Sequence, residues 1–474
     1  MSAELDLFAH RVGSVMAPAG CGKTHLIATS LKEFDGTKPV LILTHTNAGV
    51  AALKVRMQKN NVPSKTYRIA TLDGFAIRLI GRFPGRSNHN PDILKLETPK
   101  TDYPAVREAA KGLLQSGHLN DVLQASYSHL WVDEYQDCNA TQHQIVAWAA
   151  QTLPTCVLGD PMQAIFGFGG NQLVNWEGDV LKYFPSIGTL AIPWRWQLAG
   201  TTDFGNWLLT VRTKLAAGEA IDLRSAPREV TWIPVAAATA DEQRRDAART
   251  NAPKGGSVLV IGDSLSPSSR HMLCSQTPGA TVVEGVELSD LLKFGRAFNP
   301  DAPNSMEYLV EFATGLMTGV VPSKFLPRIA SIRNGSNKIP PTPAEATAVD
   351  YVKAPSLPSA IKLLDALASQ KGAHVYRPEL LRGSLNAMNI VLGSGGTLET
   401  ACVQVRERSR HLGRGLSRKA IGSTLLLKGL ESDVAVVLQP EKMSSQDLYV
   451  AMTRGAKQLV ICSEKPVLQP RIRS

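Results

Sequence analysis

The stretch that decides the fold is VGSVMAPAGCGKT at residues 12–24, a short apolar run followed by a glycine-containing loop that ends in Lys-Thr. The helical pattern HLIATSLKEF follows directly, so we expect a strand, a loop and a helix in that order. Backbone N–H groups of such a loop can surround phosphates, and the start of the helix adds positive potential. Lys23 is therefore expected to reach the β- and γ-phosphates of a nucleoside triphosphate, and the Thr24 hydroxyl to bind Mg²⁺. The other loop residues expected to contact the nucleotide are Ala17, Gly20 and Gly22, with Ala17 standing where such loops usually begin with glycine.

A second stretch, LWVDEYQDC at residues 130–138, runs from three apolar residues into a pair of carboxylates. A triphosphate site needs a carboxylate for its magnesium and a base for the attacking water. Asp133 is expected to hold Mg²⁺ through water, and Glu134 to orient and deprotonate the attacking water. An Asp-Glu pair also favours the first turn of a helix, and taken alone that interpretation would be preferred. The phosphate loop upstream makes the catalytic interpretation the stronger one.

Short apolar runs followed by polar or glycine residues occur in two regions of the chain. Runs that are apolar on both faces are typical of central strands in a parallel sheet that helices cover. The pattern predicts an α/β protein with two such domains. The expected strands are 12–16, 40–44, 130–132 and 156–158 in the first region, and 230–235, 257–262, 434–438 and 459–462 in the second. Two segments of different texture, turn-rich at 84–104 and mostly helical from about 299 to 405, are interpreted as insertions.

Composition adds weaker constraints. The 474 residues include 51 Lys+Arg and 41 Asp+Glu, a formal net charge of +10, which suits a polyanionic partner or simply a basic surface. The six cysteines are scattered, without a C-x-x-C pair or a Cys/His cluster, which argues against a zinc site and a disulfide framework. The N-terminal residues lack a signal sequence, and no apolar run approaches the roughly 18 residues of a membrane span. We expect a cytoplasmic protein that does not engage a membrane.

Six further stretches complete a recognisable set. They are LTHTNAGVAAL at 43–53, ATLDGF at 70–75, GDPMQAIFGFGG at 159–170, IPWRW at 192–196, LKGLESDVAVVL at 427–438 and LYVAMTRGAKQL at 448–459. Together with the phosphate loop and DEYQD, this set resembles superfamily 1A helicases of the UvrD/PcrA/Rep type, whose third motif has the form GDxxQxIYxWRGA. The matches run from residue 17 to residue 459 and so cover both α/β regions.

The resemblance implies two RecA-like domains that bind ATP and Mg²⁺ in the cleft between them, each with an inserted subdomain. Members of this family move 3′ to 5′ along single-stranded DNA, driven by hydrolysis. The implied parts are a RecA-like domain 1A at 1–75 and 121–198, a short 1B-like insertion at 76–120, a RecA-like domain 2A at 199–298 and 406–474, and a 2B-like insertion at 299–405.

The resemblance also assigns nucleotide-site residues. Gln163 is similar to the glutamine that links the γ-phosphate to the DNA groove, and Arg195 and Arg454 are similar to two arginine fingers, which would stabilise the developing charge on the γ-phosphate. Trp194 stands where an aromatic ring stacks on the base, with a core indole as the alternative. In the second domain, the implied nucleotide contacts are Gly429 and Glu431.

The resemblance assigns DNA contacts as well. Phe166 and Phe168 stand where aromatic rings stack with bases, worth roughly 1–3 kcal/mol per base, with a buried turn as the alternative for FGF. The first-domain residues implied to line the DNA backbone are Thr46, Asn47, Thr71 and Phe75. The short polar side chains of this set can bind phosphate and sugar without reading sequence. The basic run at 406–419 is a further candidate for phosphate contact, or a solvated helix face.

The sequence departs from the family pattern in several places. No clear glutamine-containing motif precedes the phosphate loop, so ATP, GTP or mixed use stays open. Gly169 replaces the arginine of the third motif, and Asp73 stands where the family usually has histidine. The first insertion is much shorter than the usual duplex-contacting subdomain, so we expect translocation to survive and stand-alone unwinding to be weak.

Two hypotheses from different classes follow. The leading one is an ATP-dependent 3′–5′ translocase or helicase whose partner is single-stranded DNA, with duplex junctions as a further substrate. The alternative is a regulatory ATPase subunit that senses DNA or nucleotide and controls a partner nuclease, with little unwinding of its own. Compact helicases of this type are similar to the helicase-like component of the Gabija antiphage system, which assembles with an ATPase-nuclease. Stimulation by single-stranded DNA would favour the first hypothesis, and co-purification with a nuclease the second.

Overall fold

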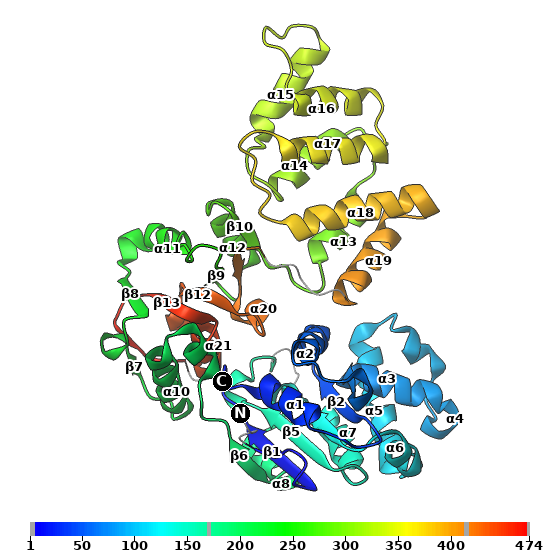
Figure 1. The fold of residues 1–474 in the computed structure, drawn as a ribbon. Helices are drawn as coiled ribbons and strands as arrows, with labels where there is room; N and C mark the ends of the chain where they lie inside the picture. Colours follow the sequence, from blue (N-terminus) through cyan, green and yellow to red (C-terminus); the bar gives the residue numbers. More distant parts are fainter. Residues whose placement is uncertain (1–4, 168–171, 412–416, 472–474) are drawn as a thin grey trace. The chain divides into compact units, whose positions relative to one another are not determined.

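The computed structural model of the chain describes residues 5–167, 172–411 and 417–471. Its contacts divide the chain into two compact units, which are described separately below (Figure 1). The first unit is Met1–Val230 with Pro440–Lys457 and Pro466–Ser474, and the second is Thr231–Gln439 with Gln458–Lys465. The expected division into four parts stays a prediction.

The first unit is built on a six-stranded sheet in which every neighbouring pair of strands is parallel. The strand order is β3-β2-β4-β5-β1-β6. The strands are β1 Val12–Met16, β2 Val40–Thr44, β3 Tyr67–Thr71, β4 Leu130–Val132, β5 Thr155–Gly159 and β6 Ser186–Thr189. Every residue of β2, β4 and β5 is buried, which explains their continuous apolar runs. The four strands predicted here are confirmed, whereas β3 and β6 are edge strands with partly exposed residues and no such run.

Helices and short ribbons complete the first unit. The helices are α1 Lys23–Lys32, α2 Asn47–Lys59, α3 Leu72–Arg82, α4 Pro84–Ser87, α5 Pro99–Gln115, α6 Asn120–Ser126, α7 Ala140–Ala150, α8 Leu181–Tyr183, α9 Trp194–Ala199, α10 Thr202–Ala216 and α21 Ser445–Met452. Short helical turns include η2 Pro91–Lys95, η3 Tyr135–Asp137 and η4 Pro161–Gln163, and β7 Ile221–Asp222 pairs antiparallel with β14 Val467–Leu468. Among the helices that the structure describes, none combines the length and apolar character that a membrane span requires.

The segment expected as the first insertion is mainly helical and shares the core of the first unit. Val106, Ala110 and Leu113 of α5 are buried in the same hydrophobic cluster as the strand residues Leu43 and Val132. The turn-rich composition of 84–104 corresponds to α4, η2 and the start of α5. Helix α5 therefore packs this short insertion against the sheet of the first unit.

Asp73 connects three helices of the first unit. Its carboxylate, near the start of α3, accepts hydrogen bonds from Nε and Nη2 of Arg107 in α5, each at 2.7 Å. Gln142 of α7 donates to the same carboxylate at 3.2 Å. The aspartate that replaces the family's usual histidine is therefore a structural anchor in this chain.

The second unit contains another six-stranded sheet, of order β10-β11-β9-β12-β13-β8. The pairs β10–β11, β11–β9 and β9–β12 are parallel. The strands are β8 Val230–Pro234, β9 Val258–Ile261, β10 Ala280–Val282, β11 Lys419–Gly422, β12 Ser432–Val437 and β13 Gly455–Ser463. The predicted runs correspond to β8, β9, β12 and β13, so the prediction of an α/β fold with two parallel-strand sheets is confirmed. The short strands β10 and β11 carry too few apolar residues to be recognised in the sequence.

The second unit also contains a helical insertion with a hydrophobic core of its own. The helices of this unit are α11 Ala240–Ala248, α12 Pro267–Ser275, α13 Ser289–Ala297, α14 Ser305–Thr314, α15 Pro322–Arg333, α16 Pro343–Lys353, α17 Leu357–Ser369, α18 Pro378–Ser394, α19 Leu398–His411 and α20 Thr424–Leu427. The prediction of a mostly helical segment at 299–405 agrees with α14–α19.

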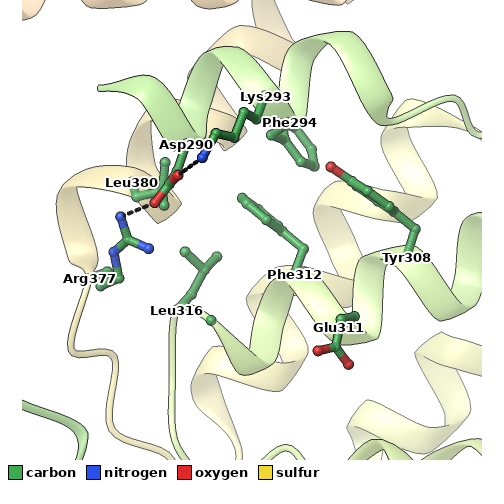
Figure 2. Close-up of a pocket in the computed structure, with 10 residues that line it drawn as sticks. Asp290, Lys293, Phe294, Tyr308, Glu311, Phe312, Leu316, Arg377 and Leu380 are labelled. Carbon is green, nitrogen blue, oxygen red and sulfur yellow. Dashed lines mark hydrogen bonds and ion pairs between the residues drawn. The ribbon is translucent and has the colours of Figure 1, made fainter. Parts of the chain in front are cut away.

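A buried arginine ties the helical insertion to the sheet. Nε and Nη2 of Arg377 donate to the carboxylate of Glu284, just after β10, at 2.6 and 3.0 Å, and Nη2 also donates to Asp290 of α13 at 2.7 Å. Figure 2 shows Arg377 and Asp290 beside a pocket of about 220 Å³, with the stacked rings of Phe294 and Phe312 on its other side. The guanidinium thus bonds carboxylates from both parts of the unit.

Replacing Asp73 by Ala should destabilise the chain by about 1–3 kcal/mol, because the partly buried Arg107 guanidinium loses its carboxylate. Urea unfolding of the purified chain, followed by circular dichroism, measures the change. Asp92→Ala is the matched control, since the Asp92–Lys95 pair is largely exposed and its loss should leave the unfolding midpoint nearly unchanged. Equal shifts in the two variants would contradict the anchoring role of Asp73.

Candidate nucleotide site

The phosphate loop connects the end of β1, where Ala17 is buried, to the start of α1. Gly20 and Gly22 have φ angles of 71° and 87°, a left-handed conformation that favours glycine. A Cβ on Gly20 would lie 2.4 Å from the Trp196 ring, and one on Gly22 would lie 2.9 Å from the Trp194 ring. Both tryptophans of IPWRW therefore pack against the loop and leave no room for side chains there. Stacking of Trp194 on a nucleotide base stays a prediction.

Lys23 lies between the two carboxylates that the sequence analysis assigned to catalysis. Its Nζ is 2.9 Å from Oδ1 of Asp133 and 2.5 Å from Oε1 of Glu134. Burial disfavours the ammonium form, but the two carboxylates outweigh burial, so the pKa of Lys23 lies above its ordinary value. Burial raises the pKa of Asp133, against the opposing effect of the Lys23 charge. Thr24 follows Lys23 in the first turn of α1.

The oxygen ligands available beside the phosphate loop suit Mg²⁺ bound to a nucleotide. A hydroxyl and one carboxylate, here Thr24 and Asp133, are oxygen ligands of the kind Mg²⁺ prefers, with phosphate oxygens and water supplying the rest. Within residues 5–167, 172–411 and 417–471, no group of three or more His, Cys, Asp or Glu side chains could hold a metal by itself.

Glu134 begins a continuous series of hydrogen bonds that reaches Gln163. Its backbone is left-handed, with φ of 57°, and its Oε2 accepts a hydrogen bond from Nε2 of Gln136 at 2.5 Å. Oε1 of Gln136 accepts from the backbone N–H of Asp160 at 3.0 Å. Oδ2 of Asp160 in turn accepts from Nε2 of Gln163 at 3.1 Å. The structure thus connects the expected base with the expected γ-phosphate glutamine.

Arg212 of α10 belongs to this network although it lies in none of the motifs. Its Nε and Nη2 donate to Oδ1 of Asp160 at 3.0 and 2.7 Å, and the Asp160 carboxylate is fully buried. Burial disfavours the charged form of Arg212, but the charge and hydrogen bonds of Asp160 favour it more strongly. The pKa of this guanidinium therefore lies above its ordinary value. The sequence offered no signal for this residue, because α10 shows only an ordinary apolar pattern around it.

Helix α21 belongs to the first unit and contacts the phosphate loop. The hydroxyl of Tyr449 accepts a hydrogen bond from the backbone N–H of Ala19 at 3.1 Å. Tyr449 is also buried, and it lies within the stretch LYVAMTRGAKQL at 448–459. Sequence reasoning gave this tyrosine no role, because its partner lies about 430 residues earlier in the chain.

The two expected arginine fingers come from different elements, Arg195 from α9 and Arg454 from the segment just after α21. Nη1 of Arg195 donates to the carbonyl of Thr453 at 2.6 Å. Arg454 is buried, and its Nε and Nη2 donate to the carbonyl of Val450 at 2.8 Å and to the Thr453 hydroxyl at 3.0 Å. Both guanidinium groups therefore meet around Thr453, and their action on a γ-phosphate stays a prediction.

Gly429 and Glu431 belong to the second unit, between α20 and β12. Gly429 has φ of 80°, and Glu431 is exposed. Their proposed contacts with a nucleotide stay predictions.

The polar residues expected to line DNA lie at the ends of neighbouring strands. Thr46 follows β2 and caps α2 by accepting from the N–H of Gly49 at 3.1 Å, and Thr71 ends β3 and caps α3 by accepting from the N–H of Gly74 at 3.0 Å. Asn47 is exposed at the first residue of α2. The structure brings the starts of these two helices to one edge of the sheet, because β2 and β3 are parallel neighbours.

The aromatic residues assigned to DNA behave differently from one another. Phe75 is 3% exposed and packs in the hydrophobic core of the first unit, and its expected contact with DNA stays a prediction. Phe166 is half-buried, with its ring 5.5 Å from that of His45, which follows β2. Phe168 and Gly169 lie outside the described residues, as does part of the basic run at 406–419.

Gly20→Ala should abolish nucleotide binding or weaken it at least tenfold, because the new Cβ meets the Trp196 ring and the left-handed backbone is strained. Titration with a fluorescent ATP analogue measures the affinity. Gly112→Ala is the control: this glycine lies within α5 with open space around its Cβ position, so alanine should leave nucleotide affinity unchanged. Normal affinity in Gly20→Ala would refute the close-approach argument.

Comparisons with known proteins agree with the site. Residues 102–179, which contain the carboxylate pair and Gln163, match the family model of the UvrD/REP helicase N-terminal domain. No curated protein matches the sequence. Among solved structures, the chain is similar to arterivirus nonstructural protein 10, a helicase determined in complex with DNA, at 8% identity and a TM-score of 0.35, covering 95% of this chain and 61% of that one. It is also similar to the Pif1 helicase from Candida albicans, at 14% identity and a TM-score of 0.28, covering 51% of each chain. This chain thus spans 61% and 51% of the lengths of those two proteins. Residues 102–179 are thus similar to the N-terminal domain of UvrD/REP helicases, and the resemblance recognised in the sequence is confirmed.

Proposed function

We propose that the chain is a DNA-dependent ATPase that moves 3′ to 5′ along single-stranded DNA. The observation that carries this proposal is the unbroken series from Lys23 through Glu134 to Gln163. It joins the residue that would bind phosphate, the one that would activate water, and the one that would sense the γ-phosphate. An ATPase coupled to a moving partner needs such a link, because hydrolysis and partner binding must alter one another.

The buried ammonium of Lys23 gives the site its nucleotide chemistry. A triphosphate entering the loop would offer this ammonium phosphate oxygens in place of the two carboxylates. Asp133 would then be released to hold Mg²⁺ together with Thr24, and the metal would neutralise charge on the phosphates. Glu134, no longer paired with Lys23, would accept a proton from the attacking water. Arg195 and Arg454 would stabilise charge on the γ-phosphate, as the resemblance implies.

The edge formed by the starts of α2 and α3 supports binding of a DNA backbone. Helix N-termini present N–H groups and positive potential to phosphates. Thr46 and Thr71, which cap these helices, present small polar side chains at the same edge. Contacts of this kind position a strand without reading its sequence, as a translocating protein requires. The 3′–5′ direction rests on the resemblance alone.

The ATPase rate of the purified chain should rise on adding single-stranded DNA, because DNA binding would favour the hydrolysis-competent arrangement of the coupled network. A steady-state ATPase assay with and without DNA measures this, with single-stranded RNA as competitor and Lys23→Ala as the inactive control. Displacement of streptavidin from the 5′ end, and not from the 3′ end, should accompany it. A rate indifferent to DNA would favour instead a regulatory subunit that acts through a partner nuclease.

Glu134→Gln should bind ATP and DNA normally while hydrolysis falls about 10²–10⁴-fold, because the amide cannot accept a proton from water. Nucleotide titration and single-turnover hydrolysis separate the two effects. Glu177→Gln makes the same chemical change at an exposed acid of the same unit and should retain full turnover. A Glu134→Gln variant with normal turnover would remove the proposed base.

A further inference from the structure

Arg212 is a buried cation that none of the motifs explains. It lies in α10, and its side chain is 16% exposed against a fully buried Asp160. Its Nη2 also lies 3.2 Å from Sδ of Met16, the last residue of β1 before the phosphate loop. One guanidinium therefore contacts the ends of two neighbouring central strands, β1 and β5, at the edge where the nucleotide loop begins.

Asp160 divides its two oxygens between different partners. Oδ1 accepts both hydrogen bonds from Arg212 and a third from the backbone N–H of Met162 at 3.1 Å. Oδ2 is thereby turned toward Nε2 of Gln163. A carboxylate without Arg212 could rotate away from Gln163, whereas the two N–H groups on Oδ1 hold it in place. The orientation of Gln163 therefore depends on Arg212 through Asp160.

The other branch of the network is equally constrained. The backbone N–H of Asp160 can only donate, so the side-chain oxygen of Gln136 must face it. The amide nitrogen of Gln136 must then face Glu134, which it contacts at 2.5 Å. Any shift of the Asp160 backbone would be transmitted to Glu134 along this path. Asp160 is thus the point where the water-activating branch and the γ-phosphate branch meet.

A purely structural role is the competing interpretation. A buried carboxylate that loses its cation is strongly destabilising, so removing Arg212 would harm folding whatever its role in hydrolysis. The two interpretations predict different results for a variant in which residue 160 carries no charge but is also not held in its orientation toward Gln163. Asp160→Asn provides that condition: it is neutral, yet its amide nitrogen cannot accept the hydrogen bonds that the carboxylate accepts.

The geometry points to Arg212 as a positioning residue for ATP hydrolysis. It holds the Asp160 carboxylate in the one orientation that sets Gln163 on one side and, through Gln136, Glu134 on the other. Arg212 itself touches neither nucleotide nor water. This inference rests on the proposed ATPase function and adds to it a residue that the family motifs do not contain.

The test compares Arg212→Met, Arg212→Lys and the double variant Arg212→Met/Asp160→Asn with the wild-type chain. Arg212→Met should lower kcat about tenfold to a hundredfold, as displaced catalytic groups do, while the Kd for a fluorescent ATP analogue changes less than about threefold. Arg212→Lys should recover part of kcat, because its ammonium can still bind Oδ1. The double variant should regain the wild-type unfolding midpoint but keep a low kcat. Lys214→Met, an exposed basic residue of the same helix, is the matched control and should behave like wild type.

The outcomes separate the two proposals. A wild-type chain without ATPase activity would overturn the proposed function and this inference with it. An active wild type with unchanged kcat in Arg212→Met would overturn the inference alone. Recovery of wild-type kcat in the double variant would do the same, because it would show that Arg212 serves only to neutralise Asp160. If Arg212→Met does not fold, Arg212→Lys and the double variant still give these readings.

Discussion

The ammonium group of Lys23 lies buried between the carboxylates of Asp133 and Glu134, and a buried cation is stable only where opposite charge and hydrogen-bond acceptors surround it. This requirement constrains the surrounding backbone. Asp133 is held at the end of β4 by its N–H, which donates to the carbonyl of Leu43 in the neighbouring strand at 2.8 Å. Glu134 adopts a left-handed conformation that places its side chain beside Lys23. The parallel sheet brings these groups to one edge, since the carboxyl ends of all its strands meet there.

The residues after the carboxylate pair have separate tasks. Tyr135 is fully buried, and its hydroxyl is 2.8 Å from Nδ1 of His143, so it anchors the turn in the core. Gln136 points the other way, into the site, and joins Glu134 to Asp160. The strand end, the short turn and the next strand are thereby coupled through one amide side chain. This coupling distinguishes the site from a phosphate loop that merely binds a nucleotide.

A paired arginine and carboxylate also fixes an inserted segment to the rest of its own unit, once in each unit. Arg107 of α5 bonds Asp73 at the start of α3, and Arg377 before α18 bonds Glu284 after β10. In each case two N–H groups of a guanidinium meet one carboxylate, which fixes both distance and angle. Helices α5 and α18 are thus attached at defined positions by side chains, and the backbone connections alone do not specify those positions.

Local pattern alone determined much of this protein. Strands β1, β2, β4 and β5, the loop with Lys23, and the Asp133–Glu134 pair were all predictable, because each depends on neighbours within a few residues. Edge strand β3 was missed because exposed residues interrupt its apolar run. Only the tertiary structure decided which partners Arg212, Tyr449 and Asp73 contact, since those partners lie far away in the sequence. It also placed the ring of Phe75 in the hydrophobic core of the first unit. Residue type and spacing specify what a side chain can do, but which partner it meets depends on how distant elements pack, and that is settled only when the sheet and its helices come together.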